Sequence, residues 1–266
     1  MSKIISALLR SCAYRPTEKI KAHPAWAFSF PDPAQHRAAS GVLRFWELMR
    51  PILRLPPRPT SYSTQFDLDE NPINESGSWK RGTDIGFYQA PRSLGGICYA
   101  QGTNAAYDDS IAHLINHGIP VNHRVGVIVS RTGGYTPPDS HEIGLYLRMV
   151  IGMGTGGNKV RGYECLFPFT GAGSFQIIRW NGTVNDNLAN FTSVSGSGSP
   201  GTINDGDLIE AQIVGSTIKC YHNGNLFRTS TDATWSDGNP GLGFFIRPGG
   251  TPSSFCAKSF FAQAAV

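Results

Sequence analysis

The chain has 266 residues, of which 31 are glycine, 18 are proline and only 16% are charged. This length is enough to bury a hydrophobic core, and the many turn-forming residues favour a β protein over a helical one. Residues 1–60 hold ten Lys and Arg against three Asp and Glu, whereas residues 61–266 hold thirteen against sixteen. The acidic balance of the longer part removes the electrostatic support for a nucleic-acid partner, so none is expected.

The first fifteen residues, MSKIISALLRSCAYR, have some features of a secretory signal. The apolar run Ile4–Leu9 is shorter than the central region of a signal peptide, and Arg10 interrupts it. A disordered or weakly helical tail is therefore expected. No run approaches the roughly 18 apolar residues that a transmembrane helix needs, so no membrane span is expected.

Eight prolines between positions 16 and 59 prevent a long regular element in this segment. Between them, Gly41–Arg50 could form a short helix with Phe45 and Trp46 on one side. Such a helix could pack on the following domain or contact a membrane surface or a protein partner, and an unstructured leader is the alternative. Arg54–Thr60 is typical of an extended polyproline linker, so the domain boundary is placed after residue 60.

From residue 61 onward, short runs alternate apolar and polar residues between turn-forming residues, which predicts at least ten short strands and no long helix. The clearest run is Asp207–Ile246, in which Gly215-Ser216 and Asn223-Gly224 predict hairpin turns. The missing crossover helices exclude a parallel α/β fold and predict an all-β antiparallel sandwich or barrel. Other expected strands include Tyr62–Leu68, Phe87-Tyr88, Gly96–Ala100, Arg124–Ser130, Ile143–Ile151, Tyr163–Phe167, Phe175–Trp180 and Ser259–Ala264.

The five cysteines form no CxxC motif and no Cys/His pattern with metal-ligand spacing. Two disulfides among the four cysteines after residue 61 are one alternative. Because Cys165 and Cys220 have apolar neighbours within strands, we interpret them instead as buried free thiols.

Turn and core signals recur in a characteristic order at Asn71-Pro72, Trp79, Arg179-Trp180 and the run Gly206–Gly243. In this order the chain resembles the concanavalin A-like lectin/glucanase superfamily, including its laminin G-like domains. The resemblance covers residues 61–266 and implies a jelly roll of two curved antiparallel sheets, whose concave face often binds glycans. Members include lectins, carbohydrate-binding modules, glycoside hydrolases and polysaccharide lyases, and the fold does not choose among them.

The carboxylates and motifs of the catalytic members are not found. Retaining hydrolysis needs two carboxylates about 5 Å apart, yet the E-x-D-x-E triplet of the superfamily is absent, as are its lyase motifs. Asp67, Asp69 and Glu70 come nearest, in a predicted loop before Asn71-Pro72. They could be catalytic carboxylates, Ca²⁺ ligands or solvated loop residues, and a Ca²⁺ site needs six or more oxygens. No catalytic residue is assigned, and Ca²⁺ is the one cofactor left open.

Sugar binding needs only a few rings and polar groups on a rigid sheet. The leading hypothesis is a non-catalytic carbohydrate-binding or adhesion domain that uses the concave face of the jelly roll. The strand positions opposite to the core supply nine candidate ligand residues: Tyr146, Arg148, Glu164, Gln176, Trp180, Glu210, Gln212, Lys219 and Tyr221.

Two alternatives stay open. One is a polysaccharide lyase or glycoside hydrolase of the same fold. The other is a structural subunit of a phage or cell surface, in which residues 1–60 would dock a protein partner or form a homo-oligomer. The fold suggests a location outside the cell or on a cell or virion surface.

Overall fold

The computed structural model describes residues 60–85, 89–102, 109–131, 141–152, 160–169, 175–181, 191–246, 248 and 250–266. The predicted N-terminal tail, the short helix at 41–50, the polyproline linker before residue 60 and the strand at 87–88 lie outside the described residues. In the described part of the chain, no helix is long and apolar enough to cross a membrane.

Almost all described regular structure is β-strand, with two short 3₁₀ turns, η1 (Gly82–Ile85) and η3 (Pro252–Ser254). The strands of the first sheet, sheet A, are β1 (Ser61–Thr64), β3 (Pro91–Leu94), β4 (Ile97–Ala100), β6 (His123–Arg131), β11 (Leu208–Val214), β12 (Thr217–His222), β13 (Asn225–Thr231) and β15 (Phe255–Ala264). Those of sheet B are β2 (Trp79–Arg81), β5 (Ser110–Leu114), β7 (Glu142–Ile151), β8 (Val160–Pro168), β9 (Gln176–Asn181), β10 (Phe191–Ser193) and β14 (Asn239–Phe245).

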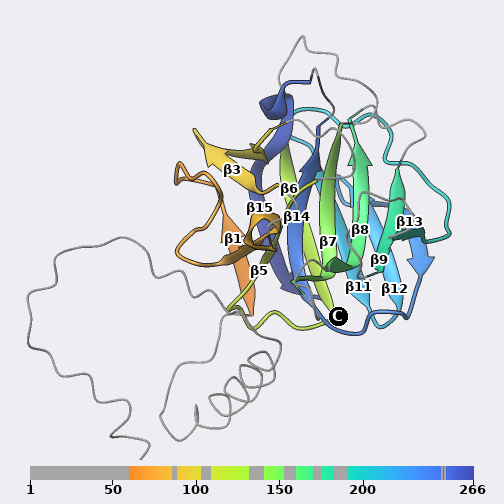
Figure 1. Cartoon of the computed structure of the whole chain (residues 1–266). Coiled ribbons are helices and arrows are strands. Elements are labelled where there is room, and N and C mark those ends of the chain that lie inside the picture. The colour runs from red at the N-terminus through yellow and green to blue at the C-terminus, as the bar shows by residue number, and fades with distance from the viewer. Residues whose placement is uncertain are drawn as a thin grey trace, which may run out of the picture. The chain divides into compact units, whose positions relative to one another are not determined.

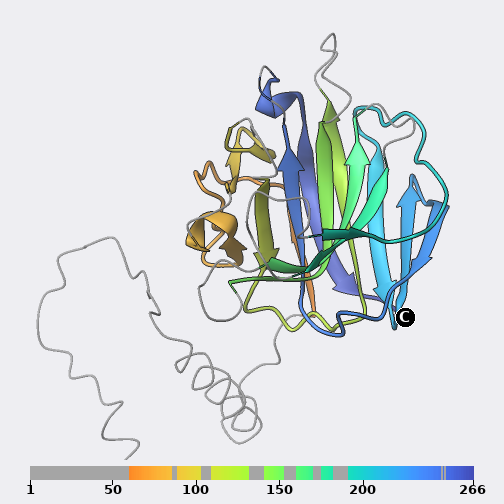
Figure 2. The same cartoon turned by 45° about the vertical axis from the view of Figure 1, so that its right-hand side comes forward.

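The two sheets are antiparallel and stack as a sandwich (Figures 1 and 2). Sheet A has the order β13-β12-β11-β6-β15-β4-β3, and β1 also pairs with β15. Sheet B has the order β10-β9-β8-β7-β14-β5-β2. The predicted all-β antiparallel sandwich is confirmed.

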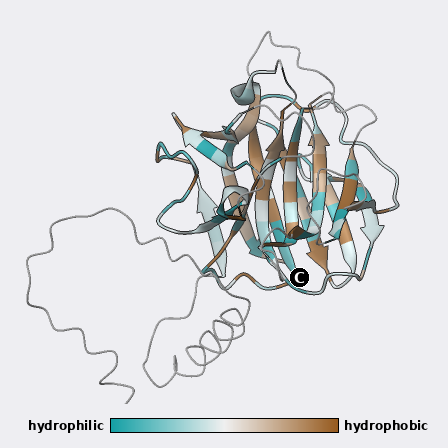
Figure 3. Cartoon of the chain, viewed as in Figure 1, coloured by the Kyte–Doolittle hydropathy of each residue, from teal (hydrophilic) through white to brown (hydrophobic). Residues whose placement is uncertain are grey.

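The core lies between the sheets because alternate residues of each strand point inward. Val125, Val127 and Val129 of β6 are fully buried, and so are Ile209 and Ala211 of β11. Burial of each larger apolar side chain contributes roughly 1.5–3 kcal/mol. The alternation is visible as brown and teal bands along the strands in Figure 3.

Both predicted hairpin turns are confirmed. Gly215-Ser216 joins β11 to β12, and Asn223-Gly224 joins β12 to β13. Asn223 and Gly224 have φ of 49° and 77°, values that these two residue types adopt at low cost.

The predicted strand Tyr62–Leu68 is wrong in its length, since β1 ends at Thr64. Phe66 has a φ of 55°, and its backbone N–H donates to Thr64 Oγ1 at 2.9 Å. This local hydrogen bond turns the chain and ends the extended backbone. The expectation of buried free thiols at Cys165 and Cys220 is confirmed.

Candidate functional site

The structure divides eight of the nine predicted ligand residues between the two outer faces of the sandwich and places the ninth at a bulge. On each strand the positions that alternate with the buried core residues point outward. Because the core separates the two outer faces, no single ligand site includes all nine. Glu210, Gln212, Lys219 and Tyr221 lie on sheet A; Tyr146, Glu164, Gln176 and Trp180 lie on sheet B; and Arg148 lies at a bulge of β7.

A row of polar side chains crosses the outer face of sheet A. Gln212 pairs in register with Arg124 on one side and with Lys219 on the other. The pairing continues from Lys219 to Thr229 and from Arg124 to Gln263. Residues in register on neighbouring strands point to the same face, and all of these side chains are exposed or half-buried. We call this set the polar row: Ser61, Gln263, Arg124, Gln212, Lys219 and Thr229, from six adjacent strands.

A second row lies beside the first on the same face. Gly126 pairs with Phe261 and Glu210, and Glu210 pairs with Tyr221. A Cβ at Gly126 would lie 2.5 Å from Phe261 Cε1 and 2.9 Å from Glu210 Cγ. The ring of Phe261 and the stem of Glu210 therefore lie over this glycine. Leu226 pairs with Tyr221 and is half exposed. We call this set the aromatic row: Phe261, Gly126, Glu210, Tyr221 and Leu226.

Arg124 connects the two rows. Its Nη2 lies 2.6 Å from Glu210 Oε2, and its guanidinium carbon lies 4.6 Å from the centre of the Tyr221 ring. A planar guanidinium suits both contacts, so they hold it in one orientation. The sequence pattern marked Arg124 only as the start of a strand, and its place beside Gln212 follows from a register between strands far apart in the chain.

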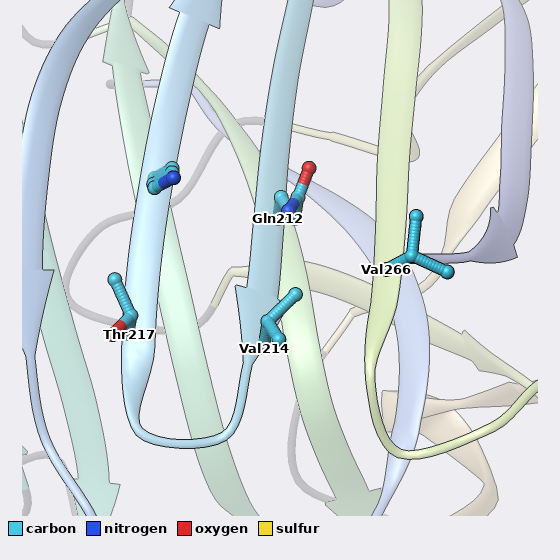
Figure 4. Close-up of a pocket in the computed structure, with 5 residues that line it drawn as sticks. Gln212, Val214, Thr217 and Val266 are labelled. Carbon is cyan, nitrogen blue, oxygen red and sulfur yellow. The ribbon is translucent and has the colours of Figure 1, made fainter.

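A shallow hollow of about 180 Å³ opens at the polar row. Gln212, Val214, Thr217, Lys219 and Val266 line it (Figure 4). The first four project from the two strands of the β11–β12 hairpin, where Gln212 faces Lys219 and Val214 faces Thr217. The hollow therefore offers an amide, a hydroxyl and an ammonium group next to two valine side chains.

The outer face of sheet B holds a buried polar cluster instead. Trp180 Nε1 donates to Glu164 Oε2 at 2.9 Å, and Tyr146 pairs in register with Glu164. Glu164 is 2% exposed. A Cβ added at Gly144 would lie only 2.1 Å from Glu164 Oε1, so the carboxyl group lies against this glycine. Burial, with a smaller contribution from the charge of Glu142, raises the pKa of Glu164 to about 8. The carboxyl group is therefore mostly protonated at neutral pH.

His113 belongs to the same face, because Gly241 pairs with it on one side and with Tyr146 on the other. Its Nδ1 lies 2.9 Å from the carbonyl oxygen of Leu114 and donates to it. Its Nε2 is then an acceptor, and it has no hydrogen-bond partner among the described residues. Burial lowers the pKa of His113 to about 4, so the imidazole is neutral. The sequence pattern did not single out this histidine.

Apolar residues cover this cluster. Phe191 of β10 and Ile85 of η1 pack against a group that includes Tyr146 and Trp180, and the rings of Trp180 and Phe191 are 6.0 Å apart. Tyr146 and Trp180 are 0% and 4% exposed, so their faces are not available for stacking on a sugar in this structure. Of the four predicted residues on sheet B, Gln176 is the exposed one.

The side chain of Arg148 bonds backbone carbonyl groups of this chain. It has a φ of 52° within β7 at a register shift, and its side chain leaves the sheet face. Its Nε donates to the carbonyl oxygen of Val121 at 3.0 Å, and its Nη1 donates to that of Trp235 at 2.8 Å. Burial lowers the pKa of Arg148. Arg148 therefore links the loop between β5 and β6 to the loop between β13 and β14.

The three predicted metal ligands do not form a cluster. Asp69 Oδ1 accepts a hydrogen bond from Gly95 N at 2.8 Å, and Glu70 Oε2 accepts from the backbone N–H of Asn74 and Glu75. Asp67 is exposed. Across the ranges that the structure describes, no group of three His, Cys, Asp or Glu residues lies close enough to hold a metal ion.

No family model matches the chain, and no curated protein matches its sequence. Among solved structures, the chain is similar to the carbohydrate-binding module CBM66 from Bacillus subtilis, with 12% identity, 73% of this chain and 97% of that chain covered, and a TM-score of 0.43. A β-glucanase of Bacillus licheniformis is 13% identical over 77% of this chain and 98% of that chain, with a TM-score of 0.45. The potassium-bound carbohydrate recognition domain of Emp46p is 10% identical over 77% of this chain and 100% of that chain, with a TM-score of 0.48. These likenesses concern the fold alone, as does the predicted concanavalin A-like resemblance.

Proposed function

We propose that the chain binds carbohydrate through the outer face of sheet A. The observation that carries the proposal is the polar row lying directly beside the aromatic row. Sugars are bound by flat apolar surfaces that contact the ring and by polar groups that bond the hydroxyls, both held on a rigid support. Here Phe261 and Tyr221 supply rings, and Gln212 and Lys219 supply an amide and an ammonium group.

The support for these groups is rigid. β11 is paired along its length with β6 on one side and with β12 on the other. Arg124 is already held by Glu210 and Tyr221 before any ligand arrives. Binding therefore orders few side chains, which lowers its entropic cost.

Exposure distinguishes the two faces. The polar row contains no fully buried side chain, whereas Tyr146, Glu164 and Trp180 on sheet B are nearly inaccessible. The resemblance places the ligands of this superfamily on a concave face; we choose the face from the exposure of the side chains.

Affinity electrophoresis in gels containing single polysaccharides, combined with a glycan array, tests the proposal. The informative variant is Gln212→Ala/Lys219→Ala, and Gln176→Ala is the matched control because Gln176 is exposed on the opposite face. We expect the parent chain and the control to be retarded by the same glycan, and the double variant to bind roughly tenfold more weakly, since two hydrogen bonds of about 0.5–1.5 kcal/mol each are lost. No retardation by any glycan, or equal retardation of all three proteins, would overturn the proposal.

A second candidate function is glycoside hydrolysis at Glu164 on the outer face of sheet B, favoured by the raised pKa of this carboxyl group. A substrate would reach the buried Glu164 only if Phe191 and Ile85, which pack against the cluster, moved aside. A carboxyl group that is protonated at neutral pH is what a general acid requires, and a second carboxylate on the same face is needed as nucleophile or base. Glu164 Oε1 lies over Gly144, and Glu142 is two residues further along the same face of β7. Release of reducing ends from β-glucans or xylans, abolished by Glu164→Gln, would support this function. No release from any polysaccharide would exclude it.

A further inference from the structure

We propose that the ligand is a single linear polysaccharide chain that lies across the strands of sheet A, with roughly one sugar unit on each strand. This inference rests on the proposed function and specifies the shape of its ligand. It follows from the direction and spacing of the two rows.

The spacing of the polar row matches a linear glycan. Neighbouring strands lie roughly 4.8 Å apart, so the six residues from Ser61 to Thr229 span roughly 24 Å. One pyranose unit of an extended chain advances by a similar distance. Each polar side chain therefore meets the next sugar rather than the same one, and the row holds roughly five or six units.

The two rows run in the same direction, one beside the other. A chain between them has its hydroxyl edge toward the polar row and a ring face toward Phe261, Tyr221 and Leu226. The side chains of the polar row include donors and acceptors but no carboxylate, and Glu210 in the aromatic row is already paired with Arg124. A neutral or an acidic glycan is accepted without placing two carboxylates side by side.

Among the described residues, no strand pairs beyond either end of the row. β13 is the last strand on its side of sheet A, and β1 pairs on one side with β15 and with no other described strand. Thr229 and Ser61 are exposed at these ends. With no described strand closing the row, we expect the site to take internal stretches of a polysaccharide as well as chain ends.

The twist of sheet A favours a single glycan chain as the ligand over the flat surface of a crystalline polysaccharide. Adjacent strands rotate by about 20–25° relative to one another, so the direction in which the side chains of the row point turns by roughly 100° over its five intervals. A flat array of parallel glycan chains cannot follow this turn. A single flexible chain can.

Calorimetric titration with soluble oligosaccharides of increasing length tests the proposal, using the series derived from the glycan that retards the protein. We expect the affinity to rise with each added unit up to about six units and then to level off. Gln212→Ala, at the centre of the row, should weaken every length. Ser61→Ala/Thr229→Val, at the two ends, should weaken the long oligosaccharides and leave the short ones unchanged, with Gln176→Ala as control.

The outcomes distinguish the linear site from carbohydrate binding itself. Binding that is already maximal with a disaccharide, or end variants that weaken all lengths equally, would overturn the linear site and leave carbohydrate binding intact. No binding of any glycan would overturn both. Retention on microcrystalline cellulose or chitin as strong as on the soluble chains would contradict the single-chain geometry.

Discussion

The guanidinium of Arg124 lies 4.6 Å from the ring centre of Tyr221, although 97 residues separate the two in the chain. They come from β6 and β12, and β11 between these strands contributes Glu210, which pairs with Arg124. This three-strand contact joins the polar row to the aromatic row. It makes the outer face of sheet A a fixed surface.

Replacing Arg124 should reduce both stability and glycan affinity. In Arg124→Gln the carboxylate of Glu210, whose side chain is 6% exposed, loses its ion-pair partner. We expect a loss of about 1 kcal/mol in the free energy of unfolding, because the arginine is itself partly exposed and its pair is screened. Urea denaturation measures this loss. The double variant Arg124→Gln/Glu210→Gln should recover stability but not affinity, and additive losses would show that the two residues are not coupled.

A methyl group at Gly126 should disturb the aromatic row. In Gly126→Ala the new Cβ would lie 2.5 Å from Phe261 Cε1, so the ring must move. We expect a loss of roughly 1–3 kcal/mol in unfolding free energy together with weaker glycan binding. Gly102→Ala is the control, since the nearest atom to its Cβ would be the flexible end of Gln89 at 3.3 Å. Equal stability of the two variants would show that Phe261 does not lie over Gly126.

The stability of the chain should depend on pH through Glu164. Its pKa is raised from an ordinary value of 4.5 to about 8 in the folded state, so between these values the folded chain holds a proton that the unfolded chain has released. The free energy of unfolding should therefore fall as pH rises from about 5 to 8, by at most about 1.4 kcal/mol per pH unit. In Glu164→Gln this component should be absent. Parallel pH profiles for the two proteins, measured by urea denaturation, would be incompatible with a buried neutral carboxyl.

The four described cysteines should react only when the chain unfolds. Cys98, Cys165, Cys220 and Cys256 are buried and free, and burial raises the pKa of Cys98 and Cys165 and raises that of Cys256 to about 11. At these three cysteines the thiolate, which is the reactive form, is therefore scarce at pH 8. Cys220 is fully buried, so a reagent cannot reach it in the folded chain. With Cys12→Ser to remove the fifth thiol, a disulfide reagent should label none of them rapidly in the folded protein and four in denaturant. Rapid labelling without denaturant would contradict the burial.

Alternation and turn residues predicted the sandwich well, because each reports a local property of the backbone. Asn223-Gly224 marks its hairpin turn, and the alternating valines of β6 mark its buried side. The same alternation shows that Glu164 and Glu210 both point away from the core. It does not show that Glu164 bonds Trp180 whereas Glu210 pairs with Arg124, because a strand pattern has no information on which sheet the strand joins.

The candidate site depends on long-range register, which the sequence pattern did not provide. Gln212 pairs with Arg124 across 88 positions in the chain, and Arg124 pairs with Gln263 across 139. A shift of one residue in either pairing would turn one strand's side chains to the opposite face. His113 was missed for a related reason, since its free Nε2 acceptor depends on the hydrogen bond that its Nδ1 makes to Leu114.

Affinity electrophoresis of three proteins tests the central claim most directly. The parent chain, Gln212→Ala/Lys219→Ala and Gln176→Ala would be run in the same polysaccharide gels, after thermal denaturation has shown that all three are folded. Binding through the polar row predicts that a glycan retards the parent and Gln176→Ala alike and retards the double variant much less. Undiminished retardation of the double variant, with retardation lost in Gln176→Ala, would contradict it and place the glycan on sheet B.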